Sequence, residues 1–435
     1  MRGVTRDMFS RAVRGLSRVP ALMARGRTNK ADMAASINIP KVTSAASAAV
    51  STPVPKAVGY WLLGMSGLVA GMVSIGGITR LTKSGLSMTD WKLQGTMPPT
   101  NLEEWNREFD RYKQFPEWQQ RQNMTLHEFK YIFFWEWGHR MMGRSLGFAF
   151  ALPFIGFAAR GMIPRRLMPR MALLFGLGGT QGLIGWWMVK SGLDKATIIG
   201  LDRNREIRVS PYRLATHLGM AFTTFAACLW TGLEIIRPTA GTVHAIKNLP
   251  KAALTSEVLK HAAKVRKFGI FNVALVATTV MSGAYVAGND AGNAYNTFPK
   301  MGDEWIPEGI LALDPVWRNF FENTATVQFN HRVLAMSTLA SIAAMFVMAR
   351  KGAGGKLWAQ ILPSHGKKFL HSAAGMSVVQ VGLGISTLLL YVPVPLAATH
   401  QLGSLALLTF STGAVHSLRF ASAGNLARIA PKLIK

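Results

Sequence analysis

Residues 136–159 have the sequence EWGHRMMGRSLGFAFALPFIGFAA, in which His139 stands where a polar loop gives way to an apolar run. Three other apolar stretches begin in the same way, with His217, His331 and His400. Each run approaches the ~20 residues that cross a bilayer core as a helix. The pattern therefore predicts an all-α membrane protein with four histidines at a similar depth.

The composition supports a polytopic membrane protein rather than a cytosolic globule. The chain has 435 residues, is 49% hydrophobic and holds one cysteine, and its mean hydropathy is positive. We expect eight membrane-spanning helices, near residues 58–78, 132–159, 171–189, 214–236, 268–287, 327–348, 369–391 and 396–418.

The two halves of the chain repeat one another. Each half contains, in the same order, a His-Arg pair, a Gly-rich segment with one Gln, and a Thr-His pair. These elements are His139-Arg140, Gln181 and Thr216-His217 in the first half, and His331-Arg332, Gln380 and Thr399-His400 in the second. An internal duplication explains this order. Because four spans are an even number, we expect two four-helix repeats related by a pseudo-twofold along the membrane normal.

The loop charges predict the orientation. Lys and Arg gather in the loops after the second, fourth and sixth stretches, whereas residues 290–322 carry two basic residues against six acidic ones. Because basic loops are retained on the inner side, these loops and both termini should lie inside. The net charge of +28 then reflects topology and a basic leader. No basic and aromatic patch supports a nucleic-acid partner.

The leader is typical of a mitochondrial presequence, with regularly spaced arginines and Asp7 as the only acid before Asp32. A disordered basic tail is the alternative. We expect residues 1–55 to be presequence and linker, 56–245 and 246–420 the two four-helix halves, and 421–435 a matrix tail. The protein should then lie in the mitochondrial inner membrane, with its histidines toward the intermembrane space.

Four histidines at matched depth in duplicated contexts indicate two haem sites. A lone intramembrane histidine would more simply be a hydrogen-bonded core residue, but neutral imidazoles on facing helices of a bundle can hold a porphyrin through axial iron bonds. We expect the pairs His139 with His217 and His331 with His400. Zinc is disfavoured because no Cys or further His stands at ligand spacing. With Cys228 as the sole cysteine, a covalently attached c-type haem is excluded.

Arginines beside the histidines are candidates for binding haem propionates. They are Arg140, Arg144 and Arg332. The alternative is an interfacial arginine whose stem lies in the membrane and whose charged end reaches water.

The residue three positions before the first histidine of each half differs between the halves. It is Glu136 in the first and Gln328 in the second. A carboxylate near a haem can exchange protons, which an amide cannot, so we predict that the first haem is transformed and the second is a fixed electron relay. A capping or solvated glutamate at a helix start is the alternative. A di-iron carboxylate site would need a second Glu-x-x-His motif, which Gln328 breaks.

The third apolar stretch is rich in glycine. Its glycines are Gly176, Gly178, Gly179, Gly182 and Gly185. They favour either close helix packing or a groove open to lipid that would suit a substrate with an isoprenoid tail.

The chain resembles the haem A synthases of mitochondria and related bacteria over roughly residues 58–420. The motifs that carry the resemblance are GGITRLTKSGLSM at 76–88, Trp91, Glu128-Phe129-Lys130, Glu136-Trp137-Gly138-His139-Arg140, Asn330-His331-Arg332 and the two Thr-His pairs. The resemblance implies eight transmembrane helices in pseudo-twofold arrangement. It also implies oxidation of the C8 methyl group of haem O to the formyl group of haem A, through a hydroxymethyl intermediate, for cytochrome c oxidase.

The resemblance also implies roles for individual residues. His139 and His217 would face haem O as the substrate, Glu136 would be the catalytic acid or base, and His331 with His400 would bind haem b. A ferredoxin-type electron-transfer partner and haem O synthase are the partners that it implies. Several bacterial relatives have a cysteine pair in an outer loop that this chain lacks, so any role for a disulfide is absent or replaced.

Two other functions compete with this interpretation. A di-haem cytochrome b that only transfers electrons would hold two permanent haems and need no acid asymmetry. A haem transporter would suit the twofold repeat, but the broken helices typical of transporters are not evident in the sequence.

Overall fold

The computed structural model describes residues 53–194 and 207–431, which belong to one compact unit, 52–435. The predicted presequence and linker lie almost wholly outside the described residues. Those residues are helical throughout, apart from turns, loops and one isolated bridge between Met301 and Glu304. The all-α prediction is confirmed.

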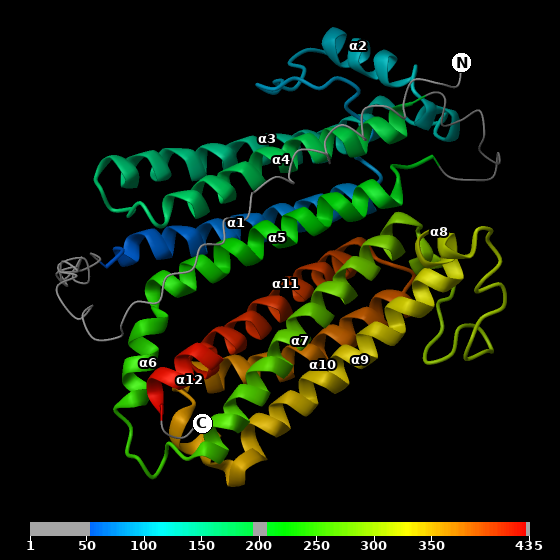
Figure 1. The fold of residues 1–435 in the computed structure, drawn as a ribbon. Coiled ribbons are helices and arrows are strands. Elements are labelled where there is room, and N and C mark those ends of the chain that lie inside the picture. The colour runs from blue at the N-terminus through cyan, green and yellow to red at the C-terminus, as the bar shows by residue number, and fades with distance from the viewer. Residues whose placement is uncertain (1–52, 195–206, 432–435) are drawn as a thin grey trace, which may run out of the picture. The chain divides into compact units, whose positions relative to one another are not determined.

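The long helices of the first half form a ring of four. They are α1 (Lys56–Leu81), α3 (Leu126–Ala159), α4 (Met168–Leu193) and α5 (Pro211–Ile236). Helix α1 packs against α3 and α5, and α4 closes the ring by packing against the same two helices (Figure 1).

The long helices of the second half make a ring of their own. They are α7 (Ser256–Gly288), α9 (Thr324–Lys351), α10 (Ser364–Leu389) and α11 (Val394–Ser417). Helix α7 packs against α9 and α11, and α10 packs against the same two. The rings meet where α1 and α5 contact α11 and where α5 contacts α7.

Four shorter helices lie at the two ends of this bundle. Helices α2 (Leu102–Tyr112) and α8 (Asn319–Glu322) lie at one end, and α6 (Thr239–Lys247) and α12 (Ala423–Ile429) lie at the other (Figure 1). The end with α2 and α8 holds the long connections after α1 and α7 and is called the loop-rich end below.

All eight predicted stretches are helices, and seven of them are long and apolar enough to cross a membrane. The exception is α11, in which His400, Gln401 and several Ser and Thr residues lower the mean hydropathy. Much of α11 is buried, including Leu405, Leu408 and Ala414. Because protein rather than lipid surrounds such a helix, its sequence need not be apolar throughout.

Several helices begin before the apolar stretches that predicted them. Helix α3 starts at Leu126, where Thr125 and Glu128 form a capping box that satisfies the first backbone N–H groups. Its first turns pack against α2 in an aromatic cluster that includes Phe109 and Phe129. His139 therefore lies well inside a helix rather than at its start.

The junction between the rings combines apolar packing with ion pairs. Val69, Phe222, Val276 and Leu405, from α1, α5, α7 and α11, belong to one buried cluster. At the loop-rich end, carboxylate oxygens of Asp290 accept hydrogen bonds from Arg80 at 2.7 Å and from Arg208 at 2.6 Å. These contacts tie the first half to the end of α7.

Candidate functional site

The structure brings the four histidines together as two pairs. The ring centres of His139 on α3 and His217 on α5 lie 6.5 Å apart, and those of His331 on α9 and His400 on α11 also lie 6.5 Å apart. The ring planes are inclined at 68° and 86°. Each pair joins two helices of one ring near the loop-rich end of the bundle.

This spacing leaves room for one metal atom that both imidazoles of a pair would bind. Both pairs have the same separation although their helices differ in sequence. The donor set is also suitable, since neutral imidazoles bind haem iron. The residues present therefore fit a haem at each pair.

A glycine on a neighbouring helix contacts the edge of each imidazole. A methyl group placed on Gly76 or Gly384 would lie 2.9 Å from Cε1 of His139 or His400, and one on Gly185 or Gly283 would lie 3.0 Å from Cε1 of His217 or His331. Real Cβ atoms almost never approach as closely as 2.9 Å, and 3.0 Å is tighter than nine in ten of their contacts. A side chain at any of these four glycines would therefore press on an imidazole.

The glycine-rich part of α4 does not pack closely against a neighbour. Gly176, Gly178, Gly179 and Gly182 have no atom within 4 Å of the position that a Cβ would occupy. Only Gly185 makes a contact, and its neighbour is His217. Close helix packing is therefore not the role of these four glycines.

Glu136 is buried at 2% exposure and fully hydrogen-bonded. Its Oε2 accepts from the Ser87 hydroxyl and the Met88 backbone N–H, each at 2.7 Å, and its Oε1 accepts from Arg140 at 2.5 Å. Three donors, one of them cationic, suit an ionised carboxylate. The alternative of a capping or solvated glutamate is wrong, because Glu128 makes the cap and Glu136 is buried eight residues further along the helix.

In the second half the adjoining loop has the opposite hydrogen-bonding character, although Arg332 donates to Oε1 of Gln328 at 3.4 Å. The Nε2 of Gln328 donates to the carbonyl oxygens of Ala291 at 2.9 Å and Tyr295 at 3.2 Å. The loop beside Glu136 offers donors, whereas the loop beside Gln328 offers acceptors. The divergence between acid and amide thus extends to the backbone around each residue.

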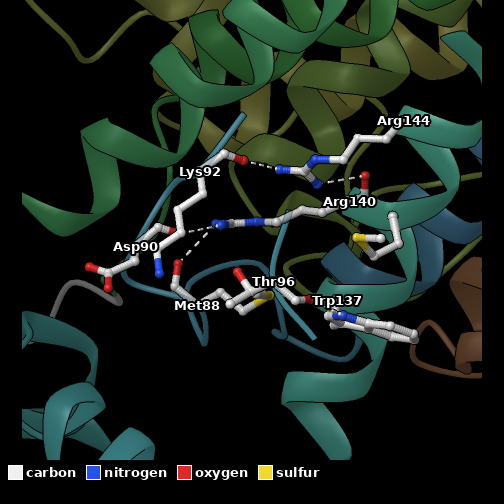
Figure 2. A pocket seen from close by; sticks show the side chains of 8 residues that line it. Met88, Asp90, Lys92, Thr96, Trp137, Arg140 and Arg144 are labelled. Carbon is white, nitrogen blue, oxygen red and sulfur yellow. Dashed lines mark hydrogen bonds between the residues drawn. The ribbon is translucent and has the colours of Figure 1, made fainter. Parts of the chain in front are cut away.

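The three predicted propionate ligands hold loops at the loop-rich end. Arg140 donates to the carbonyl oxygens of Met88 and Asp90, and Arg144 donates to that of Lys92 (Figure 2). Arg144 also donates to the carbonyl oxygen of Leu93. Together with Trp137, they line a small hollow over this loop.

In the second half, Arg332 reaches the loop that precedes α9. It donates to the carbonyl oxygens of Tyr295, at 2.9 Å, and Lys300, at 3.0 Å. Its Nε is buried and has no partner among the described residues. That atom remains free for a further acceptor.

Sequence reasoning missed the residues that surround the predicted ligands. The motif at 76–88 supplies Gly76 against His139 and both Ser87 and Met88 against Glu136. Its length and fixed spacing signalled importance, but the partners became visible only once α1 and α3 were placed side by side. Gln181 and Gln380, which were evident from the sequence only as members of the internal repeat, donate to the carbonyl oxygens of His217 and His400, at 2.9 and 2.8 Å.

Two rings of long helices, seven of which are long and apolar enough to cross a membrane, each with one pair of imidazoles, are typical of a multi-pass membrane protein that binds haem. Over residues 59–412 the chain matches the family COX15-CtaA, described as "Cytochrome oxidase assembly protein". This protein belongs to that family, as its motifs predicted.

Individual relatives agree with the family assignment. The chain is 47% identical over 381 residues to "Heme A synthase COX15" of Arabidopsis thaliana, covering 87% of this chain and 77% of that one. It is 46% identical over 366 residues to the human protein of the same name, covering 84% and 83%. It is also 41% identical over 374 residues to the "Heme A synthase-mitochondrial ferredoxin fusion protein" of Schizosaccharomyces pombe, covering 81% of this chain and 58% of that one.

Proposed function

We propose that this protein is a haem A synthase in which the first histidine pair holds haem O and the second holds haem b. The oxidation of haem O to haem A follows from its close relatives, which are named haem A synthases and are similar to this protein over most of its length. The assignment of haems to pairs rests on the equal 6.5 Å spacing within each pair and on the carboxylate that accompanies only the first.

In the first site, His139 and His217 hold and orient the substrate. Glu136 is the proposed acid or base for oxidation of the C8 methyl group through a hydroxymethyl stage. A buried carboxylate one turn from the ligand can take a proton from the water that attacks the oxidised methyl carbon. Arg140 pairs with that carboxylate and holds it in position.

In the second site, His331 and His400 hold haem b, which when bound supplies one-electron chemistry. Conversion of a methyl group to a formyl group removes four electrons, so an electron partner is required. A relative that is fused to a mitochondrial ferredoxin supports a ferredoxin-type partner. Haem O synthase is the proposed source of the substrate, which would enter from lipid past the open glycines of α4.

Arg140, Arg144 and Arg332 are proposed to lie beside the haem propionates while holding the loops over each site. The unpartnered Nε of Arg332 supports this role in the second site. A propionate there would receive a charge-assisted hydrogen bond from a group already fixed in place.

We further propose eight transmembrane helices, with α11 as the eighth, in two halves related by a pseudo-twofold along the membrane normal. The matching contacts within the two helix rings support this arrangement. The halves would be residues 56–245 and 246–420, between a presequence with linker at 1–55 and a matrix tail at 421–435. The protein would lie in the mitochondrial inner membrane with both termini in the matrix.

Chromatography of the haems extracted from purified protein tests this proposal. We expect wild type to yield haem b together with haem O, its hydroxylated form or haem A. We expect Glu136→Gln to yield haem b and haem O only, because an amide cannot exchange the proton.

The substitution also places an amide beside Arg140, so a variant of that arginine is the control. Arg140→Gln removes the ion pair but keeps the carboxylate, and it should retain partial conversion. Formation of haem A by Glu136→Gln at the wild-type rate would remove Glu136 from the chemistry.

A further inference from the structure

The four imidazoles differ in what their Nδ1 atoms contact. For Nε2 to bind iron, the ring proton must lie on Nδ1. A hydrogen-bond acceptor beside Nδ1 fixes that tautomer, orients the ring and makes the imidazole a stronger ligand. The Nδ1 partner is therefore a measure of how firmly each histidine can hold a haem.

His331 has such an acceptor in Ser282 on α7. The Ser282 Oγ lies 2.7 Å from Nδ1 of His331 and 2.7 Å from the backbone oxygen of Thr279. A serine hydroxyl has one hydrogen, and the carbonyl of Thr279 can only accept it. The contact with His331 must then run from Nδ1–H to Oγ. The Nε2 lone pair is consequently free for iron.

The glutamines beside two other histidines provide no acceptor at Nδ1. The Nε2 atoms of Gln181 and Gln380 lie 3.2 Å from Nδ1 of His217 and His400, respectively. An amide nitrogen only donates. One of its two hydrogens goes to the backbone oxygen of the neighbouring histidine, and the other can go to Nδ1, so neither glutamine nitrogen accepts a proton from Nδ1–H.

His139 has neither kind of partner. Its Nδ1 is buried and has no hydrogen bond among the residues that the structure describes. Gly76 contacts His139 as Gly283 contacts His331, so the residues that precede these glycines are equivalent. They are Ile75 in the first half and Ser282 in the second. An apolar side chain thus replaces the hydroxyl.

We infer that Ser282 is a positioning residue that makes the second site a permanent haem site, and that Ile75 leaves His139 an exchangeable ligand. This inference rests on the proposed haem ligation and adds to it a physical reason for the different fates of the two haems. A site that takes up a substrate haem and releases a product haem needs a histidine that dissociates readily from iron. A site with a resident haem needs a histidine that stays bound.

Haem transfer from the purified full-length protein to excess apomyoglobin tests the inference, with the redox potential of haem b as a second readout. Ser282→Ala should speed release of haem b by about 10-fold or more, which is the usual effect of losing a partner of a metal-bound histidine. The potential of haem b should become more positive, because a weaker imidazole donor stabilises ferric iron less. Ser282→Thr keeps the hydroxyl and should restore both values.

Ile75→Ser is the reciprocal variant and should slow release from the first site. Unchanged release and unchanged potential in Ser282→Ala would overturn the inference, as would unchanged first-site release in a folded Ile75→Ser protein. His331→Ala distinguishes failure of the proposed haem ligation from failure of the inference about Ser282. If it retains haem b, the proposed ligation fails. If it loses haem b while Ser282→Ala has no effect, the inference alone fails.

Discussion

At the scale of single residues, the glycines opposite the imidazoles set close steric limits on each site. A Cβ on Gly384 would lie 2.9 Å from His400, so the imidazole must shift if alanine replaces the glycine. Elsewhere in a helix this substitution stabilises by up to about 1 kcal/mol. A loss of haem can therefore be attributed to the displaced ligand and not to a weakened helix.

We predict that Gly384→Ala lowers the affinity for haem b by about 10-fold or more, the range found when the setting of a metal-bound histidine is disturbed. The haem-to-protein ratio of purified protein measures the effect. Gly375→Ala, on the same helix and with no atom within 4 Å of the added group, is the control. Equal haem content in the two variants would contradict the steric argument.

Some of this residue-level detail could be predicted from sequence and some could not. The four histidines and the contrast of Glu136 with Gln328 follow from comparing the halves, because ligands and their neighbours recur at matched positions. The donors around Glu136 and the hydroxyl of Ser282 did not follow. Each depends on which face of one helix meets another, and α-helical repeats alone do not specify that.

At the scale of helices, all eight long elements were predicted, since an apolar run of membrane length leaves few alternatives. Their ends were less predictable. The caps lie in polar sequence, as with Thr125 before α3, and aromatic packing against α2 extends α3 outward. Helix α11 shows the limit of hydropathy, because its neighbours in the protein replace lipid.

The ion pairs of Asp290 connect α1 and the segment before α5 to the end of α7. We predict that Asp290→Asn destabilises the protein by about 1–2 kcal/mol, because two charge-assisted bonds in a partly buried setting are weakened. Asp290 has a φ of 51°. Asparagine tolerates this left-handed conformation well, so the variant changes charge without adding strain.

Thermal unfolding in detergent measures this loss. Asp110→Asn is the control, since Asp110 pairs at the surface with Lys113 and with no other cation of residues 53–194 and 207–431, and exposed pairs contribute about 0–1 kcal/mol. A midpoint for Asp290→Asn equal to that of the control would show that the junction does not depend on these charges.

At the scale of the whole molecule, the order of the helices around each ring and the contacts between the rings came only from the structure. Short loops predict that helices consecutive in sequence are also neighbours in space. No sequence pattern predicts that α1 contacts α11. Gly77 against Gln401 and Gly219 against Met281 are close contacts across that junction. They fix how near the two sites lie.

The proposed topology can be tested with single cysteines, because the one native thiol, Cys228, is buried. We predict that Glu308→Cys in the loop before α9 reacts with an impermeant maleimide in intact mitoplasts. Arg166→Cys, between α3 and α4, should react only after the membrane is permeabilised, because basic loops lie inside. The reverse pattern would invert the orientation.

The central claim is that two imidazole pairs hold two haems of different identity. Haem extraction from His139→Ala/His217→Ala and from His331→Ala/His400→Ala, expressed with ample haem supply, tests it most directly. The account predicts that the first variant keeps haem b and loses haem O and its oxidised products, while the second loses haem b. Wild-type contents of both pigments in either variant would contradict it.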